Sequence, residues 1–228
     1  NKLATSSYRF VIGASLLPLH LALGLGMVGP SSLFPLIMDH YSLGRGTVSL
    51  LVALVGLAIT VSLIPGGIIS TKLGPKNAAI TAGVLMSAGI FAGLAPPFVV
   101  LVVVRVVFGL GVAIILPATS VLIFQWFPPR ERPFMNGLYL AGQTFGVALA
   151  MFFSAPIAET LGWQYPLFLY GAFALIGTVT WLFLSKTPTS GEYSSTPIPM
   201  RETLRVLRDK NSLFLSVAAL GPFALFMG

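Results

Sequence analysis

Cysteine is absent from this 228-residue sequence, and histidine occurs only twice. Without cysteine the chain can form no disulfide and offers no thiolate to a metal, and the redox state of its compartment is left open. Two histidines leave little from which to build a metal centre or a pair of nucleophile and base. The sequence also has no G-x-x-x-x-G-K-[ST] loop for a nucleotide phosphate. We therefore expect no enzyme activity, no catalytic residues, no bound metal and no cofactor.

Charge is the second scarce property. Only 8% of the residues are charged, whereas soluble domains carry about 25%. By contrast, 56% of the residues are hydrophobic and the mean hydropathy is +0.93. No water-soluble fold of this length could bury so much apolar surface, so we predict an integral membrane protein in contact with the lipid bilayer. The net charge of +7 could indicate nucleic acid, but most cations lie between apolar segments, where a membrane surface explains them better. We therefore expect no nucleic-acid partner.

Six apolar segments are long enough to cross about 30 Å of hydrocarbon as helices. They lie near residues 9–38, 46–71, 77–95, 98–125, 134–160 and 164–185. The polar stretch 186–210 is rich in Ser, Thr and Pro before it turns basic, and its arginines have helical spacing. We interpret it as a linker with an amphipathic helix, and the apolar residues 211–228 as the start of a seventh transmembrane helix. The predicted fold class is therefore all-α, a polytopic membrane bundle with a six-helix core.

The positions of the lysines and arginines predict the orientation in the membrane. All but two of the 13 Lys and Arg residues lie before the first segment, between the second and third, between the fourth and fifth, or after the sixth. The exceptions are Arg45, on the opposite side, and Arg105, inside the fourth segment. The positive-inside rule then places the N-terminus and the linker 186–210 in the cytoplasm. The plasma membrane is the expected location.

Two segments share a short pattern that suggests an internal repeat. His20 precedes Gly24-Leu25-Gly26 in the first segment, and Arg105 precedes Gly109-Leu110-Gly111 in the fourth at the same spacing. We expect these glycines to let neighbouring helices pack closely. Chance repetition of common membrane dipeptides is the alternative. If the match is genuine, the segments form two three-helix repeats, as in transporters whose sites lie between the repeats.

Four landmarks in the same order resemble the major facilitator superfamily of transporters. Residues 105–113 fit the R-x-x-x-G-x-G-x-A pattern of that family's fourth helix. Residues 126–132 and 162–168 are similar to its W-F-P-P-x-E-R loop and to the G-W-R…F entry of its sixth helix. The loop after the second segment resembles the family's gate loop, G-x-x-x-D-R/K-x-G-x-R/K, through Gly67, Lys72, Gly74 and Lys76. The resemblance implies an N-terminal six-helix half and the start of the seventh helix.

Three departures from the family pattern limit what the resemblance implies. Thr71 stands where the gate loop usually has an aspartate, and Lys72 and Lys76 are also explained as positive-inside anchors. The fifth segment keeps Gly137 and Gly146 but not the later G-P and G-G pairs of the family's antiporter motif, which favours symport or uniport over antiport. The family usually has twelve spans, so we expect a missing C-terminal half of the same chain, or a partner membrane subunit, to complete the cavity.

Buried polar residues are the candidates for binding a solute or for coupling its transport to an ion. Arg105 could hold an anion, pair with a carboxylate or brace its helix by bonding backbone carbonyls. His20 could couple transport to protons, although a bonded structural role is the simpler interpretation. Gln143 and Thr144 could offer hydrogen bonds to a solute or hold helices together. The expected binding wall comprises the first, fourth and fifth segments.

These observations lead to two hypotheses. The first is a secondary active transporter that moves a small solute by alternating access. The loop 126–132 and the buried arginine resemble the branch of the family that carries organic anions together with a cation. The alternative is a transporter-like membrane protein that serves as a structural or assembly subunit of a larger membrane complex, which Thr71 and the short chain suggest.

Overall fold

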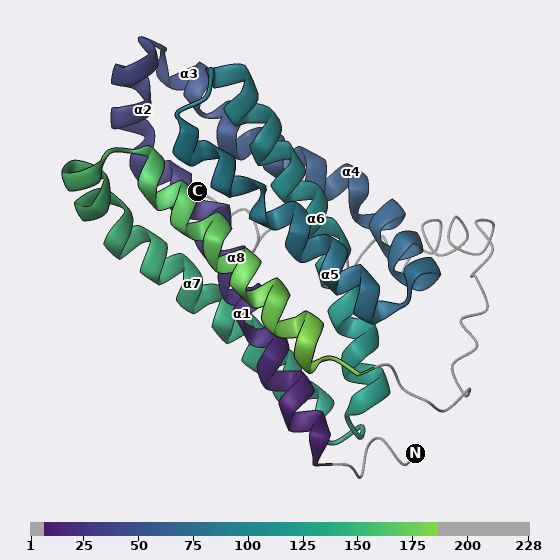
Figure 1. Ribbon diagram of the computed structural model, residues 1–228. Coiled ribbons are helices and arrows are strands. Elements are labelled where there is room, and N and C mark those ends of the chain that lie inside the picture. The colour runs from purple at the N-terminus through teal and green to yellow at the C-terminus, as the bar shows by residue number, and fades with distance from the viewer. Residues whose placement is uncertain (1–6, 187–228) are drawn as a thin grey trace. The chain divides into compact units, whose positions relative to one another are not determined.

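The computed structural model describes residues 7–186 (Figure 1). Its elements are α1 (Tyr8–Val28), η1 (Gly29–Leu33), α2 (Phe34–Tyr41), α3 (Arg45–Val48), α4 (Leu50–Leu73), α5 (Pro75–Met86), η2 (Ser87–Leu94), α6 (Phe98–Trp126), α7 (Arg132–Leu161) and α8 (Gln164–Leu184), where η denotes a 3-10 helix. Apart from Lys186, the predicted linker and the predicted start of a seventh helix lie outside the described residues and stay predictions.

These elements join into six spans that are long and apolar enough to cross a membrane. The spans are Tyr8–Tyr41, Arg45–Leu73, Pro75–Leu94, Phe98–Trp126, Arg132–Leu161 and Gln164–Leu184. No strand occurs among the described residues, as expected for a chain whose backbone groups must bond within each membrane-spanning segment. The prediction of an all-α membrane bundle with six spans is confirmed.

Three of the spans are not continuous α-helices, and the second of them is interrupted at Ser49, between α3 and α4. The first changes from α1 to the 3-10 segment η1 at Gly29 and returns to α-helix at Phe34. Pro30 explains this break, because proline has no N–H for the carbonyl four residues earlier and its ring crowds the preceding turn. The third span changes from α5 to η2 at Ser87. Breaks of this kind leave backbone groups that need partners from neighbouring helices.

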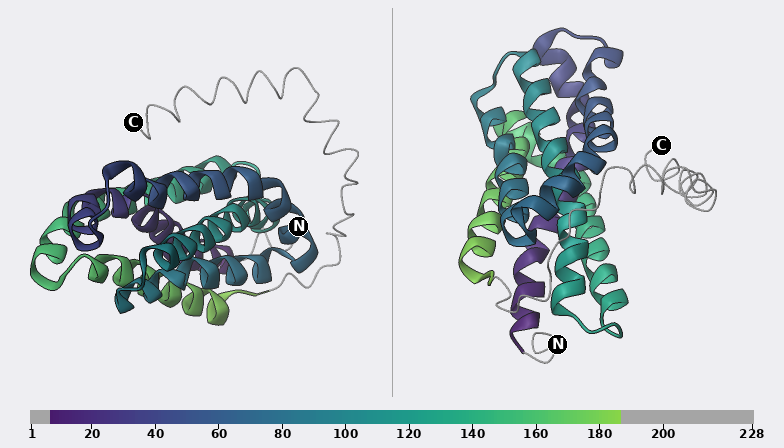
Figure 2. Two further views of the ribbon diagram at one scale, coloured as in Figure 1. Left: turned by 90° about the horizontal axis from the view of Figure 1, so that it is seen from above. Right: turned by 90° about the vertical axis from the view of Figure 1, so that its right-hand side faces the viewer.

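The packing of the helices follows the predicted repeat. Helix α1 packs on α7, and α6, its counterpart in the second repeat, packs on α4. In the same way α6 packs on α5, and α1 packs on α8 (Figures 1 and 2). When each of the first three spans is exchanged for its counterpart among the last three, the pair α1 and α7 becomes the pair α6 and α4, and the pair α6 and α5 becomes the pair α1 and α8. This agrees with a bundle built from two three-helix repeats.

Burial divides the bundle into a centre and a periphery. The first and fourth spans are the most buried, with 67% and 56% of their most apolar stretches inside the protein, whereas the second and fifth have 17%. The centre is apolar, with fully buried residues such as Leu16, Leu19 and Ile115. The outer surface carries large apolar side chains, including Val61, Phe152 and Phe183, which suit contact with lipid or with another membrane element. The two helices that hold Arg105 and His20 are thus the central ones.

Candidate functional site

Arg105 lies in the first half of α6 and is 5% exposed. Its Nη1 donates a hydrogen bond to the carbonyl of Gly26 in α1 at 2.7 Å, and its Nε donates to the carbonyl of Leu51 in α4 at 3.1 Å. The guanidinium carbon lies 5.0 Å from the centre of the Phe108 ring, close enough for a cation–π contact. Arg105 therefore ties three helices together through backbone carbonyls.

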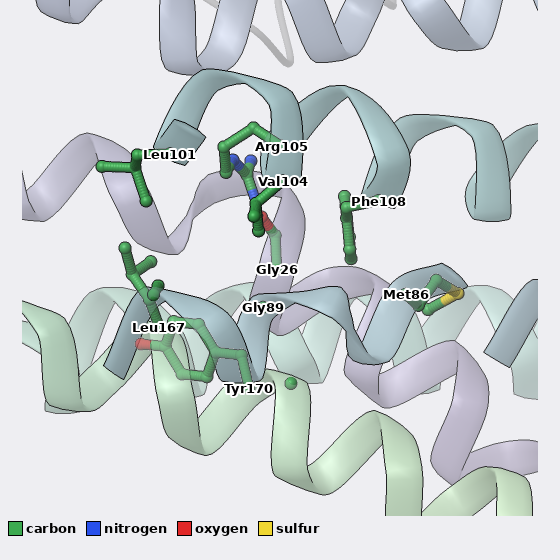
Figure 3. Close-up of a pocket in the computed structure, with 11 residues that line it drawn as sticks. Gly26, Met86, Gly89, Leu101, Val104, Arg105, Phe108, Leu167 and Tyr170 are labelled. Carbon is green, nitrogen blue, oxygen red and sulfur yellow. The ribbon is translucent and has the colours of Figure 1, made fainter. Parts of the chain in front are cut away.

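Arg105 also helps to line a small cavity between the helices (Figure 3). Its Nη2 is buried and has no hydrogen-bond partner among the described residues. The cavity has a volume of about 20 Å³, and Gly26, Phe108 and Tyr170 contribute to its lining. This volume accepts about one water molecule, whereas an organic solute needs a pocket of about 300 Å³ or more. The cavity that Arg105 lines among the described residues is therefore much smaller than a solute-sized pocket.

His20 lies in α1 and is 4% exposed. Its Nε2 is 2.9 Å from the Thr119 hydroxyl of α6, and its ring stacks on the Tyr139 ring of α7 with 4.7 Å between the ring centres. The Tyr139 hydroxyl in turn donates to the Gly13 carbonyl at 3.2 Å. His20 is thus held by side chains from two neighbouring helices, and sequence reasoning missed both of these partners.

Arg105 and His20 are both too buried to reach a solute at the surface of this bundle. Any further protein that packs on this bundle can only lower the exposure of Arg105 and His20. A solute on the outer face of α1 or α6 would thus meet neither side chain without a rearrangement of the helices. The prediction that these two residues bind a solute stays a prediction.

The other two candidates, Gln143 and Thr144, lie on α7 and do not line the Arg105 cavity. Thr144 is exposed and its hydroxyl donates to the Leu140 carbonyl of its own helix at 2.9 Å. Gln143 is half-buried, and its backbone carbonyl lies against Gly24 of α1. The structure therefore does not gather the four candidates into one site.

The four predicted packing glycines lie at close helix contacts. A Cβ at Gly24 would come within 1.9 Å of the Gln143 carbonyl oxygen, and one at Gly111 within 2.7 Å of the Ala82 carbonyl oxygen. At Gly26 the nearest atom would be in the Phe108 ring, at 2.4 Å. The contact at Gly109 is looser, because a Cβ there would lie 3.1 Å from its nearest neighbours. Three of the four glycines, all except Gly26, thus lie against the backbone of a neighbouring helix.

The predicted gate loop comprises the end of α4, Gly74 and the start of α5. Lys76 is half-buried and its Nζ donates to the Ser185 carbonyl at the end of α8, at 2.7 Å. Lys72 is exposed, and the Thr71 hydroxyl bonds the Ile68 carbonyl of its own helix at 2.8 Å. Gly74 has a φ of 76°, which L side chains rarely adopt, whereas Gly67 lies near Pro117. Lys76 is therefore already bonded to the end of α8 within this bundle.

An ion pair that the sequence did not suggest lies at the end of the bundle where α1 begins. Arg9 binds Glu131 through two hydrogen bonds of 2.9 Å each, from Nε to Oε2 and from Nη2 to Oε1. The two residues are 122 positions apart, so no local spacing could reveal the pair. The available signal was that Glu131 is a carboxylate in a loop otherwise rich in arginine. This pair joins α1 to the connection between α6 and α7.

Acidic and metal-binding groups are sparse in residues 7–186. Asp39 and Glu159 are exposed near the opposite end of the bundle, away from Arg9 and Glu131. Among the described residues no three His, Cys, Asp or Glu side chains group together in a way that could hold a metal ion. Arg105 therefore has no carboxylate partner in this part of the chain.

Comparisons with solved structures agree with this arrangement of helices. A bacterial homologue of the human lysosomal transporter Spinster, solved in an inward-facing and unoccupied conformation, matches with a TM-score of 0.69 and 19% identity, over 82% of this chain and 45% of that one. A peptide transporter in complex with sulfate matches with a TM-score of 0.67 and 17% identity, over 96% of this chain and 45% of that one. At these identities the likeness concerns the fold alone.

Comparisons with curated sequences give relatives named as transporters. Probable anion transporter 7 of Oryza sativa subsp. japonica is 26% identical over 75% of this chain and 40% of its own length. The hexuronate transporter of Bacillus subtilis is 26% identical over 74% of this chain and 40% of its own length. Human sialin is 29% identical over 56% of this chain and 27% of its own length. The chain thus spans less than half the length of these three relatives. The family model described as Major Facilitator Superfamily matches residues 16–228, and the chain belongs to this superfamily of membrane transporters, not to a family of enzymes.

Proposed function

We propose that this chain forms the N-terminal half of a secondary active transporter that moves anions by alternating access. The observation that carries the proposal is the buried charge of Arg105, which bonds only to carbonyl oxygens and has no carboxylate partner among the described residues. A cation at this depth is costly unless it serves a purpose. Its positive potential extends further in a low-dielectric interior than in water and favours an anion over a cation nearby. The names of the relatives, with anion and hexuronate among them, support the same class of solute.

The second half of the transporter is part of the proposal. The chain covers 45% of the Spinster homologue, so a further six-helix half of the same protein, or a partner subunit, would complete the cavity. Gln143 and Thr144 are the polar candidates that are at least partly exposed on the present bundle. They would contact the solute directly, while Arg105 would act through its field. Symport or uniport remains the expected mode, in the plasma membrane.

The orientation also belongs to the proposal. The end of the bundle where α1 begins, which also holds Lys72, Lys76 and Lys186, would face the cytoplasm, because this end carries most of the described cations. Among the lysines of the gate loop, Lys72 is exposed and could meet the other half, whereas Lys76 already bonds α8. The gate would thus depend on Lys72 more than on Lys76.

A second function has one structural observation in its favour. Thr71 replaces the usual aspartate of the gate loop, and its hydroxyl bonds its own helix, so it supplies no charge for a contact between halves. A transporter-like subunit that assembles with a larger complex would need no such gate. This alternative predicts co-purification with a partner in fixed stoichiometry and no solute-dependent stabilisation.

Uptake by the purified complete transporter in liposomes, with the half or subunit that completes the cavity, tests the proposal. The solutes are a radiolabelled hexuronate, glutamate and inorganic phosphate, and the matched neutral control is the hexose that corresponds to the hexuronate. We expect saturable uptake of at least one anion, no uptake of the hexose, and a rise in Tm with the same anion. Uptake of the hexose at the same rate as the hexuronate, or no uptake and no thermal shift with any of the anions, would contradict an anion transporter.

A further inference from the structure

We infer that Arg105 is a positioning residue that completes α1 at the point where Pro30 breaks it. In a continuous α-helix the N–H of residue 30 would bond the carbonyl of residue 26. Residue 30 is proline and has no N–H. The Gly26 carbonyl instead accepts a 2.7 Å hydrogen bond from Arg105 Nη1. The guanidinium of α6 thus supplies the donor that the first helix lacks.

The need for such a donor follows from the surroundings of Gly26. The residue is buried in the apolar centre of the bundle, and the Phe108 ring covers it so closely that a Cβ would come within 2.4 Å. A buried carbonyl without a partner is costly, because no water replaces the lost bond. The carbonyl of Leu25, one residue earlier, accepts from the N–H of Gly29. The bond from Arg105 is therefore directed at the carbonyl that the proline leaves without its usual donor.

The second hydrogen bond of Arg105 makes the bond to Gly26 a mechanical link. Nε donates to the Leu51 carbonyl of α4 at 3.1 Å, so one rigid guanidinium fixes α4 against the break in α1. The planar fork of arginine suits two acceptors in different directions, whereas a lysine would offer one point of charge. Nη2 is the nitrogen left over, and it has no hydrogen-bond partner among the described residues. Two of the three nitrogens thus serve the backbone of this bundle.

The prediction for function differs from that of a solute-binding arginine. If Arg105 positions α1, its loss should slow the conformational cycle and lower the maximal uptake rate, while the loss of its positive field should change the affinity for solute by no more than about threefold. If it binds the solute, its loss should raise the KM whatever residue occupies position 30. The two roles are therefore separated by restoring an N–H at position 30.

A double-mutant cycle on the purified protein makes this test. Arg105→Met should lower the Tm in the wild-type background and by less than about half as much in the Pro30→Ala background, because an alanine at position 30 has an N–H that can donate to the Gly26 carbonyl. Pro18→Ala is the matched control, since it removes a proline inside α1. The N–H of an alanine at position 18 would donate to the carbonyl of residue 14 and not to that of Gly26. Pro30→Ser repeats the test with a second residue that has an N–H. Equal losses in the two backgrounds, or equal rescue by Pro18→Ala, would overturn the inference.

Uptake of the anion by the proteins of this cycle and by Arg105→Lys gives the functional measurement and rests on the proposed function. We expect Arg105→Met to lower the maximal rate, Arg105→Lys to retain part of it, and Pro30→Ala to restore it further in the Arg105→Met background, with the KM within about threefold of wild type throughout. A KM raised by about tenfold or more in the protein with both Pro30→Ala and Arg105→Met would overturn the positioning role. If wild type shows no uptake, the proposed function fails, while the thermal cycle still decides the inference.

Discussion

The two central helices, α1 and α6, both contain a Gly-Leu-Gly sequence followed by a proline and accommodate that proline differently. Helix α1 gives way to 3-10 geometry around Pro30, and Arg105 bonds the Gly26 carbonyl. Helix α6 stays a single α-helix from Phe98 to Trp126 through Pro117. The carbonyl four residues before Pro117 belongs to Ala113 and lies against Gly66 of α4, where a Cβ would come within 2.3 Å of the oxygen. One repeat uses a charged side chain and the other uses close packing.

The same contrast holds for the two repeat-related ionisable residues. Arg105 reaches from α6 to backbone carbonyls of α1 and α4, whereas His20 reaches from α1 to a hydroxyl and an aromatic ring of α6 and α7. A repeat in the sequence pattern has therefore been kept in the helix packing but not in the hydrogen bonding. Variants at three pairs of residues probe such differences within the bundle.

The repeat-related glycines Gly24 and Gly109 give the largest expected difference. Gly24→Ala should destabilise the protein by about 3 kcal/mol, because its Cβ would meet a backbone oxygen that cannot move without shifting α7. A Cβ at Gly109 would lie 3.1 Å from both the Ala58 Cβ and the Val55 carbonyl oxygen. A small shift of the neighbouring helix relieves this contact, so Gly109→Ala should lower the stability by less than about 1 kcal/mol. Denaturant titration of the two variants in the same detergent measures both values. Equal losses would show that the two contacts are equally tight.

The stability losses of Arg105→Met and His20→Leu should differ by less than those of the two glycine variants. Removing Arg105 leaves the Gly26 and Leu51 carbonyls without this donor, which we expect to cost about 2 kcal/mol. Removing the His20 imidazole frees the Thr119 hydroxyl, which can bond a carbonyl of its own helix instead, so the loss should be about 1 kcal/mol. The free energy of unfolding of each variant checks this order. A larger loss for His20→Leu than for Arg105→Met would reverse the comparison.

The smallest expected effect distinguishes the two lysines of the gate loop. Lys76→Met removes a donor to the Ser185 carbonyl and should lower the stability by about 1 kcal/mol. Lys72→Met should leave the stability of this bundle unchanged, because Lys72 is exposed, but it should reduce uptake if Lys72 contacts the other half. Measuring stability and uptake of both variants separates the two roles. A stability loss for Lys72→Met that matches the loss for Lys76→Met would argue against this distinction.

The sequence predicted the fold well because its strongest signal is local. Long apolar runs separated by short connections determine the number of spans. The repeat was visible because each copy keeps its glycines at the same spacing. These features depend on residues that are close together in the chain.

The site was harder to predict because it depends on which side of each helix faces the centre. Arg105 and His20 were expected to share a wall with Gln143 and Thr144, yet the two ionisable residues point into the bundle and bind different partners. The ion pair between Arg9 and Glu131 joins distant parts of the chain, so no spacing indicated it. The four-residue spacing from Gly26 to Pro30 was present in the sequence, but nothing local identified Arg105 as the donor.

Hydrogen exchange of the break in α1 tests the central claim most directly. Mass spectrometry of a peptide that covers Gly29–Leu33 should show exchange at least about tenfold faster in Arg105→Met than in wild type, because the break loses its anchor. His20→Leu should leave exchange in this peptide unchanged. Unchanged exchange in Arg105→Met, or the same acceleration in both variants, would contradict the claim that Arg105 holds α1 together at Pro30.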